Sequence, residues 1–464
     1  MTIRLDVSGM LDRSIPSGPG DAVLAVLAAL APRLAAAHDA LLAMAAAGVL
    51  GFRELEAQAA ERTRAADWAA ATAAETDDVV VLGIGGSALG AVALRTALLG
   101  REWNLWARDA RGGRPRLHVL DNVDPRAVSG LLDARTVPLA GARFVAISKS
   151  GSTAETMAQY LLVRDRLRAA GLSLRKHLAF VTDPSRGALR RIADAEGIPA
   201  FAVPENVGGR FSVLTPVGTL PAALVGMDVD ALIAGATAMR DRCATGVLRA
   251  NPALAFAALQ WRAHTAAGQG THVLMPYSEA LRDLAPWFVQ LWAESLGKRA
   301  ASGESVGPTP IAAVGATDQH AQVQLFMEGP DDKTVTFVDV ETHDEIVIPP
   351  TVDAPPELAY LRGHGFAELL RAEARATAGA LARAGRPTMT LRVERADAWH
   401  LGGLFMFFEL ATIYAAQLYG VDPLDQPGVE LGKQLTYFQF GHPDWQQMRA
   451  VWDALPGADP DWHL

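Results

Sequence analysis

The sequence of 464 residues contains a single cysteine, Cys243, which excludes intrachain disulfides and cysteine-rich metal sites. Its neighbours carry no nucleophile signature, so we expect an ordinary thiol. Met1–Gly20 lacks the basic start and apolar run of a secretory signal. The Ala-rich stretch 22–50 is interrupted by charged residues and a proline, which favours amphipathic helices over a membrane span. These absences predict a soluble, cytoplasmic, globular protein that does not engage a membrane.

Positive charge is also scarce, because 42 Lys and Arg residues stand against 51 Asp and Glu residues, for a formal net charge of -9. Nucleic acids select a basic protein face, so this balance argues against a nucleic-acid partner. A small phosphorylated ligand needs only local donors and is compatible with it. Only five cations are lysines, either by coincidence or because these positions require a compact ammonium. They are Lys149, Lys176, Lys298, Lys333 and Lys433.

Short apolar runs alternate with helical patterns from residue 78 onward. This alternation predicts a parallel sheet with helices on both faces, where ligands collect at the carboxyl ends of strands. The expected strands are 78–83, 117–121, 144–148, 177–182 and 200–203. The expected helices between them are 87–99, 125–134, 154–170 and 186–196.

A second, less regular α/β region follows a soft boundary near residues 221–229. Its expected strands are 271–276, 311–314, 334–340 and 387–392, and its expected helices are 252–267, 286–296, 356–384 and 401–419. We therefore expect two doubly wound α/β domains, residues 71–225 and residues 226–464, the latter including C-terminal helices. Residues 1–70 are expected to form a helical segment that packs on the second domain.

Two glycine- or hydroxyl-rich turns follow strands of the first region. The turn at 83–90, Gly-Ile-Gly-Gly-Ser-Ala-Leu-Gly, lets backbone approach a ligand and opens a helix whose free amides favour an anion. It also resembles a dinucleotide fingerprint, but the acidic partner that this motif requires would have to be Glu102, where no strand is apparent. The turn at 148–156 has five hydroxyls and Lys149 at a helix start. Ser and Thr are common N-caps, yet this many hydroxyls favour a phosphate monoester, and the spacing is not that of a P-loop.

The helix expected at 286–296 carries the best candidate for a general base. Gln290 and Glu294 are four residues apart and share a face. Glu294 lies in the last turn, where the helix dipole and any covering by aromatic neighbours disfavour its anion. A carboxylate tuned in this way suits proton abstraction from carbon. By itself, the segment is better explained by a solvated Glu near a helix end.

Three further charged candidates are weaker one by one. His320 follows an expected strand, Arg210 lies in a glycine-flanked loop, and Lys433 lies near a helix start. Most histidines are surface or core residues, and most loop arginines are solvated. The sequence has no zincin cluster and no Gly-x-Ser-x-Gly elbow, so we expect no metal.

Taken together, the motifs resemble the glucose-6-phosphate isomerase family from about Gly83 to Gln434. The most specific are Gly-Gly-Arg-Phe-Ser (208–212), Glu-Ser-Leu-Gly-Lys (294–298) and Gly-Val-Glu-Leu-Gly-Lys-Gln (428–434). The resemblance implies two sugar-isomerase (SIS) domains, a homodimer with active sites at the subunit interface, and no cofactor. Ala88 and Ala154 depart from the commonest pattern, which bears on substrate breadth more than on reaction type.

The resemblance also implies a role for each candidate residue. Glu294 would be the base that moves a proton between C2 and C1 through a cis-enediol(ate), and Arg210 would stabilise the enediolate. His320, from the neighbouring subunit, and Lys433 would open the sugar ring. The remaining implied substrate contacts are Ser87, Gly86, Ser148, Lys149, Ser150, Thr153, Gly209, Gln290 and Gln426.

Three alternatives remain at this stage. A nucleotide-dependent oxidoreductase would use the turn at 83–90 and would not need Glu294. A non-catalytic sugar-phosphate sensor would keep residues 148–153, but it has no use for Glu294, Arg210 and Lys433 together. A relative that also accepts mannose phosphate would be expected to be shorter and to lack several of these motifs.

Overall fold

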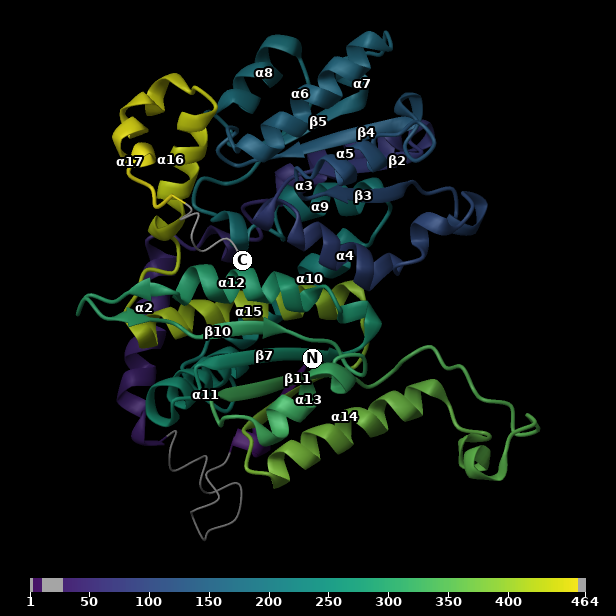
Figure 1. Cartoon of the computed structure of the whole chain (residues 1–464), viewed down its shortest axis with the longest axis vertical. Coiled ribbons are helices and arrows are strands. Elements are labelled where there is room, and N and C mark those ends of the chain that lie inside the picture. Colours follow the sequence, from purple (N-terminus) through teal and green to yellow (C-terminus); the bar gives the residue numbers. More distant parts are fainter. Residues whose placement is uncertain (1–2, 11–27, 458–464) are drawn as a thin grey trace. The chain divides into compact units, whose positions relative to one another are not determined.

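The computed structural model describes residues 3–10 and 28–457 (Figure 1). It divides into two compact units, Met1–Pro423 and Leu424–Leu464. The smaller unit contains helices α16 (Glu430–Gln439) and α17 (Arg449–Asp453), which are tied together by ring contacts such as that of Phe438 with Trp452. These helices were expected within the second α/β domain. They form a unit with its own internal packing, and the expected domain bounds stay a prediction.

The first sheet is entirely parallel and has the strand order β3-β2-β4-β5-β6. Its strands are β2 (Asp78–Leu82), β3 (Arg116–Leu120), β4 (Ala142–Ile147), β5 (Leu178–Thr182) and β6 (Ala200–Ala202). Val80 pairs with Phe144 across β2 and β4, and both side chains are fully buried. The helices of this half are α4 (Leu89–Leu99), α5 (Pro125–Leu131), α6 (Ala154–Ala169), α7 (Leu174–His177), α8 (Ala188–Glu196) and α9 (Pro216–Leu224). The predicted α/β fold with a parallel sheet is confirmed here.

Strand order also determines where a ligand would lie on this sheet. The chain leaves β2 for β3 on one side and then crosses to β4 on the other side of β2. The connections after β2 and β4 therefore run in opposite directions, and such a switch point opens a crevice at the carboxyl ends of the strands. The two turns singled out in the sequence follow these two strands.

The second sheet has the strand order β1-β12-β11-β7-β10. Its parallel strands are β7 (Thr271–Tyr277), β10 (Thr309–Ala312), β11 (Lys333–Val340) and β12 (Thr388–Val393). The edge strand β1 (Arg4–Asp6) pairs antiparallel with β12, and a small hairpin joins β8 (Lys298–Arg299) to β9 (Ser305–Val306). The sequence did not predict β1, β8 or β9, because each has only two or three residues and too few positions for a periodic pattern.

Two helical expectations need correction. The pattern at 356–384 contains a 3-10 turn, Pro356–Leu361, and then α14 (Phe366–Arg383), because Gly363 takes a positive φ of 77° that ends the first element. The N-terminal segment is shared between the two halves. Helix α2 (Ala31–Ala46) packs on α15 (Ala398–Tyr419), whereas α3 (Ala59–Thr72) packs on α9 and β6 of the first half. The part of the expected stretch 22–50 that precedes residue 28 lies outside the described residues.

Helix α15 is the central core helix of the larger unit. It is apolar on all sides and packs against α2, α10 (Val229–Arg242), α11 (Pro252–Ala267) and α12 (Leu284–Leu296). Its length and composition would permit a membrane span, but 94% of its most apolar window is buried inside the protein. A Cβ on Gly402 would lie 1.8 Å from the carbonyl oxygen of Leu232, so glycine is needed where α15 crosses α10.

Helix α15 also carries a buried carboxyl group, that of Glu409. The residue is fully buried, and neither carboxyl oxygen has a hydrogen-bond partner among the described residues. Burial raises the pKa of Glu409 well above its ordinary value. The group is therefore protonated in the folded protein at pH values where it is ionised in the unfolded chain.

We predict that Glu409→Gln makes stability less dependent on pH. Between the unfolded and folded pKa values the unfolded chain binds fewer protons, so wild-type stability falls with rising pH by up to about 1.4 kcal/mol per pH unit. The neutral amide removes this term. Urea unfolding from about pH 5 to about pH 9 measures it, with the exposed Glu304→Gln as control. Equal pH slopes for Glu409→Gln and wild type would contradict the assignment.

Candidate active site

The glycine-rich turn after β2 contacts a second turn from further along the chain. The first is the 3-10 turn Gly85–Ser87, and the second is the 3-10 turn Gly209–Phe211. A Cβ on Gly86 would lie 2.3 Å from the carbonyl oxygen of Gly209, whereas a Cβ on Gly209 would meet no atom of the described residues within 4 Å. The glycine at 86 therefore permits a backbone contact that positions Arg210, the next residue of the second turn.

The turn after β4 gathers its hydroxyls into one cluster. The Ser148 hydroxyl lies 2.9 Å from that of Thr153 and 3.5 Å from that of Ser150. The Ser152 hydroxyl donates to Ser150 Oγ at 3.2 Å. Thr153 is the N-cap residue of α6, yet its side chain makes no capping hydrogen bond. The hydroxyls face one another at a helix start, which is an arrangement suited to an anion rather than to capping.

Lys149 connects this hydroxyl cluster to the Arg210 turn. Its ammonium donates to the carbonyl oxygens of Glu205 and Val207, both at 2.8 Å. Burial lowers the pKa of Lys149, and nearby acidic groups oppose the shift only in part. The sequence indicated a cation beside the phosphate. In the structure the ammonium instead ties the segment before Gly208 to the hydroxyl turn.

Glu294 lies at the last turn of α12, as the sequence predicts. Its Oε1 accepts from Gln290 Nε2 at 3.1 Å, and its Oε2 lies 3.3 Å from Arg210 Nη1. The side chain is 35% exposed. Trp287 and Trp292 of α12 are buried in the core, and the expected cover of Glu294 by aromatic residues stays a prediction.

Arg210 is buried, and its guanidinium joins three segments. Nε donates to Ser295 Oγ at 2.7 Å, Nη1 faces Glu294, and Nη2 donates to the carbonyl oxygen of Pro423. Ser295 was missed as a site residue, although it stands beside Glu294 in the Glu-Ser-Leu-Gly-Lys motif. Its hydroxyl fixes the plane of the guanidinium and thereby the direction from which Arg210 meets the carboxylate.

The site thus combines three chemical elements. Hydroxyls at a helix start suit an anionic group, a partly exposed carboxylate suits proton transfer, and a guanidinium suits charge that develops nearby. In residues 3–10 and 28–457, no group of three or more His, Cys, Asp or Glu side chains is arranged to hold a metal ion.

Comparisons with known proteins identify the family. A family model described as phosphoglucose isomerase matches residues 44–454. The chain belongs to the phosphoglucose isomerase family. Among relatives, a glucose-6-phosphate isomerase of Rubrobacter xylanophilus is 46% identical over 375 residues, which are 80% of this chain and 84% of that protein. A glucose-6-phosphate isomerase of Thermus thermophilus is 42% identical over 361 residues, covering 78% of this chain and 83% of that protein.

Solved structures share the fold of this chain. A hypothetical protein from Thermus thermophilus superposes with a TM-score of 0.85 at 38% identity, covering 94% of this chain and 99% of that chain. A glucose-6-phosphate isomerase from Chlamydia trachomatis, at 24% identity, has a TM-score of 0.71 and covers 85% of this chain and 76% of that chain. The second comparison bears on the fold alone. The predicted resemblance to the phosphoglucose isomerase family is confirmed, and the oxidoreductase and sensor alternatives are set aside.

Three further residues that the sequence predicts for the site of this phosphoglucose isomerase family member lie outside the turns and the helix described above. His320 is an exposed residue of α13 (Gln319–Glu328), and its ring has no hydrogen-bond partner in the described part of the protein. Gln426 and Lys433 belong to the smaller unit, where the Lys433 ammonium lies 2.9 Å from Glu430 Oε1. Their participation in the site stays a prediction.

We predict that Gly86→Ala destabilises the protein whereas Gly209→Ala does not. The new Cβ at 86 would overlap the backbone of Gly209 and force the two turns apart, at a cost of about 1–3 kcal/mol. The Cβ at 209 enters open space. Free energies of unfolding from urea titrations compare the pair directly. Equal losses of stability in the two variants would contradict the described contact.

Proposed function

We propose that this protein interconverts glucose 6-phosphate and fructose 6-phosphate without a cofactor. The proposal is supported by the family and by relatives of 46% and 43% identity that are named glucose-6-phosphate isomerase. The observation that carries it is the Glu294 carboxylate held between Gln290 and the buried Arg210. A cytoplasmic location and a place in glycolysis and gluconeogenesis form part of the proposal.

In the proposed mechanism, the hydroxyls of Ser148, Ser150 and Thr153 anchor the phosphate together with the Gly86–Ser87 turn. Glu294 removes the proton from C2 of the open-chain aldose and returns it to C1, which passes the sugar through a cis-enediol(ate). A base that serves two adjacent carbons must be oriented toward them and still be free to reach both. The amide of Gln290 holds one carboxylate oxygen at 3.1 Å, and a third of the side chain remains exposed.

The Arg210 guanidinium supplies the charge that this intermediate needs. Negative charge develops on the sugar oxygens when C2 loses its proton, and a preorganised cation stabilises that charge without reorganisation at the moment of reaction. Arg210 is preorganised because Ser295 and the carbonyl of Pro423 hold two of its nitrogens. The guanidinium is thus held in position before the substrate binds.

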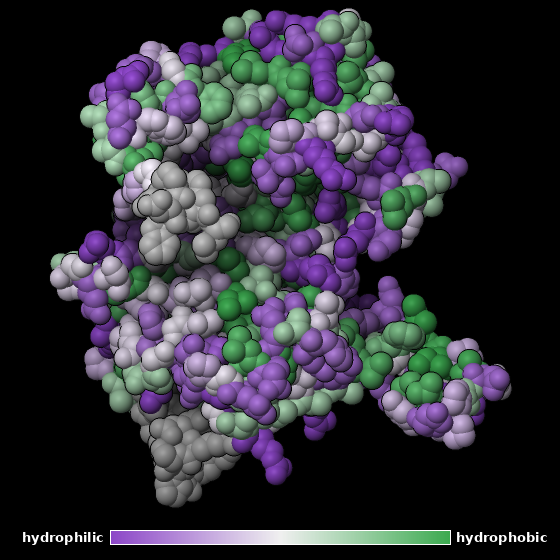
Figure 2. All heavy atoms as spheres, in the orientation of Figure 1, coloured by the Kyte–Doolittle hydropathy of each residue, from purple (hydrophilic) through white to green (hydrophobic). Residues whose placement is uncertain are grey.

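Ring opening is assigned to His320 of a second copy and to Lys433, with Gln426 on the phosphate side. This assignment requires a homodimer. The segment 342–365, between β11 and α14, extends away from the second sheet and gathers apolar residues at the surface (Figures 1 and 2). Ile346 and Tyr360 of this segment are each 69% exposed, and Phe366, the first residue of α14, is 58% exposed. Exposed apolar side chains in such a segment support coverage by another copy of the chain.

We predict that Glu294→Gln lowers turnover by about 10²–10⁴-fold and leaves substrate affinity within a few-fold of wild type. The amide keeps the size of the side chain but accepts no proton. A coupled assay of fructose 6-phosphate conversion measures turnover, and Glu304→Gln is the matched exposed control. Undiminished activity in Glu294→Gln would remove Glu294 as the base.

We also predict that two inactive variants restore activity when they are unfolded together and refolded. If His320 acts across the interface, a mixed dimer of His320→Ala and Glu294→Gln contains one site with both native residues. Random pairing then yields about a quarter of wild-type activity. Activity no higher than the average of the two separate variants would place His320 and Glu294 in the same chain's site, or His320 in no site.

A further inference from the structure

A polar pocket of about 420 Å³ lies between the C-terminal half of α4 and the start of α12. Arg95 and Thr96 of α4 line one side, and Arg282 and Asp283 line the other. The proposed active site involves the opposite ends of both helices. At a rise of 1.5 Å per residue along a helix axis, Arg95 lies about 12 Å from Ser87, and Asp283 lies about 16 Å from Glu294. The pocket is therefore a separate place in the molecule.

Arginine dominates the charge of this pocket. Arg95, Arg101 and Arg282 line it. Arg101 Nη1 lies 2.7 Å from Glu279 Oε1, and Arg282 uses two nitrogens on the same carboxylate at 2.8 and 3.0 Å. Asp283 is the lining carboxylate, and it accepts from the Thr96 hydroxyl. Arg101 and Arg282 thus share the carboxylate of Glu279, whereas Arg95 has no ion pair with a described residue.

Arg95 is therefore the lining arginine that differs from the other two. Its side chain is half-buried, and within residues 3–10 and 28–457 it has no hydrogen-bond or ion-pair partner. The other two lining arginines are both paired with Glu279. A half-buried guanidinium that lacks a carboxylate partner and faces a polar hollow is a binding group for an external anion, because its planar fork matches phosphate oxygens.

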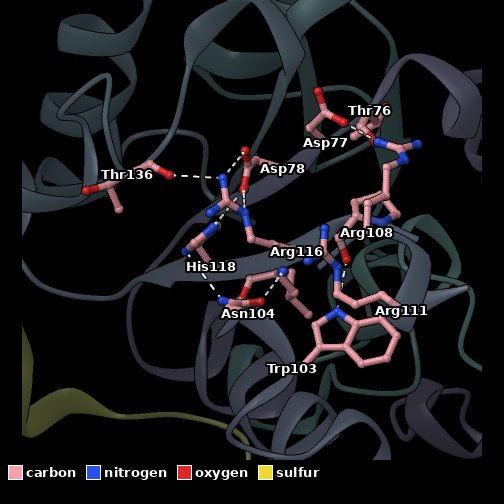
Figure 3. A network of polar contacts seen from close by, with 12 residues as sticks. Thr76, Asp77, Asp78, Trp103, Asn104, Arg108, Arg111, Arg116, His118 and Thr136 are labelled. Atoms are coloured by element: carbon pink, nitrogen blue, oxygen red, sulfur yellow. Dashed lines mark hydrogen bonds and ion pairs between the residues drawn. The ribbon is translucent and has the colours of Figure 1, made fainter. Parts of the chain in front are cut away.

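Trp103 and Asn104 form part of the pocket wall, and their polar contacts are drawn in Figure 3. Asn104, which lines the pocket, exchanges hydrogen bonds with both the amide and the carbonyl of Leu117, at 3.0 and 2.8 Å. Trp103 Nε1 donates to the carbonyl of Pro115 at 2.9 Å. Behind this wall, the buried Asp78 accepts from Arg116 and His118.

Burial and hydrogen bonding have opposite effects on the pKa of the Asp78 carboxyl group. Burial alone would raise the pKa of Asp78, but the hydrogen bonds from His118 and Arg116 outweigh burial and lower it. The carboxylate therefore remains an acceptor for both side chains. A ligand entering the pocket would meet a preformed wall, which reduces the entropy lost on binding.

We propose that this pocket binds the phosphate group of a small anionic metabolite at a second site, outside the proposed active site. Arg95 provides the unpaired guanidinium, and Arg101 and Arg282 provide further donors from the far side. Arg95 belongs to α4, and Arg282 lies two residues before α12. A bound phosphate would therefore connect these two helices. At their other ends, α4 follows the glycine-rich turn and α12 carries Glu294. The proposal does not depend on the reaction assigned to the active site.

Hydrogen exchange with inorganic pyrophosphate as the probe tests the proposal at low chloride concentration. We expect pyrophosphate to slow exchange in residues 92–104 and 279–285 of the full-length wild-type protein. In Arg95→Ala this protection should vanish, with a loss of affinity of about tenfold or more in calorimetry. Arg95→Lys, which keeps the charge without the fork, should bind with intermediate affinity.

The matched control is Arg262→Ala. Arg262 of α11 is also half-buried and without a partner among the described residues, but it does not line the pocket. It should bind pyrophosphate as wild type does. No protection at 92–104 in wild type, undiminished protection in Arg95→Ala, or protection confined to the hydroxyl turn at 148–153 would each overturn the proposal.

Discussion

The Arg210 guanidinium holds the two α/β halves in the relation that the candidate site needs. It reaches from a turn of the first half to Ser295 and Glu294 on α12 of the second, and to the carbonyl of Pro423 at the end of the larger unit. A buried arginine is stable only when its nitrogens are paired, so the requirement to satisfy this one group specifies three approaches at once. Losing any one of these partners would weaken the arrangement that positions Glu294.

Around this arginine, the backbone itself does much of the positioning. The Gly86 turn lies against Gly209 at a distance that excludes any side chain, and Lys149 links the hydroxyl turn to the segment that leads into Gly209. The hydroxyls at the switch point of the first sheet and the carboxylate on α12 are therefore connected through short, directional contacts. Proton transfer tolerates errors of a fraction of an ångström at most, which makes such contacts a functional requirement.

In the core, by contrast, the positions of the helices are determined by packing alone. Helix α15 is enclosed by four helices, and a glycine permits its close crossing with α10. One polar group, Glu409, is buried within this helix without a partner among the described residues. It is tolerated because a protonated carboxyl group costs far less to bury than an ionised one. Stability thereby becomes linked to pH at a residue remote from the proposed chemistry.

Much of this protein was determined by local sequence alone. Strands of the first sheet, the last-turn position of Glu294 and the clustering of hydroxyls after β4 follow from periodicity and turn chemistry, which depend on neighbouring residues. The very short strands β1, β8 and β9, the split of the N-terminal helices, the role of Ser295 and the carbonyl partners of Lys149 depend on groups far apart in the chain. No local pattern records such contacts, because a hydroxyl or a carbonyl acquires a role only when folding places a particular cation beside it. For the same reason Arg95 is one arginine among many in the sequence, and only the tertiary structure shows that it lines a polar pocket without a partner among the described residues.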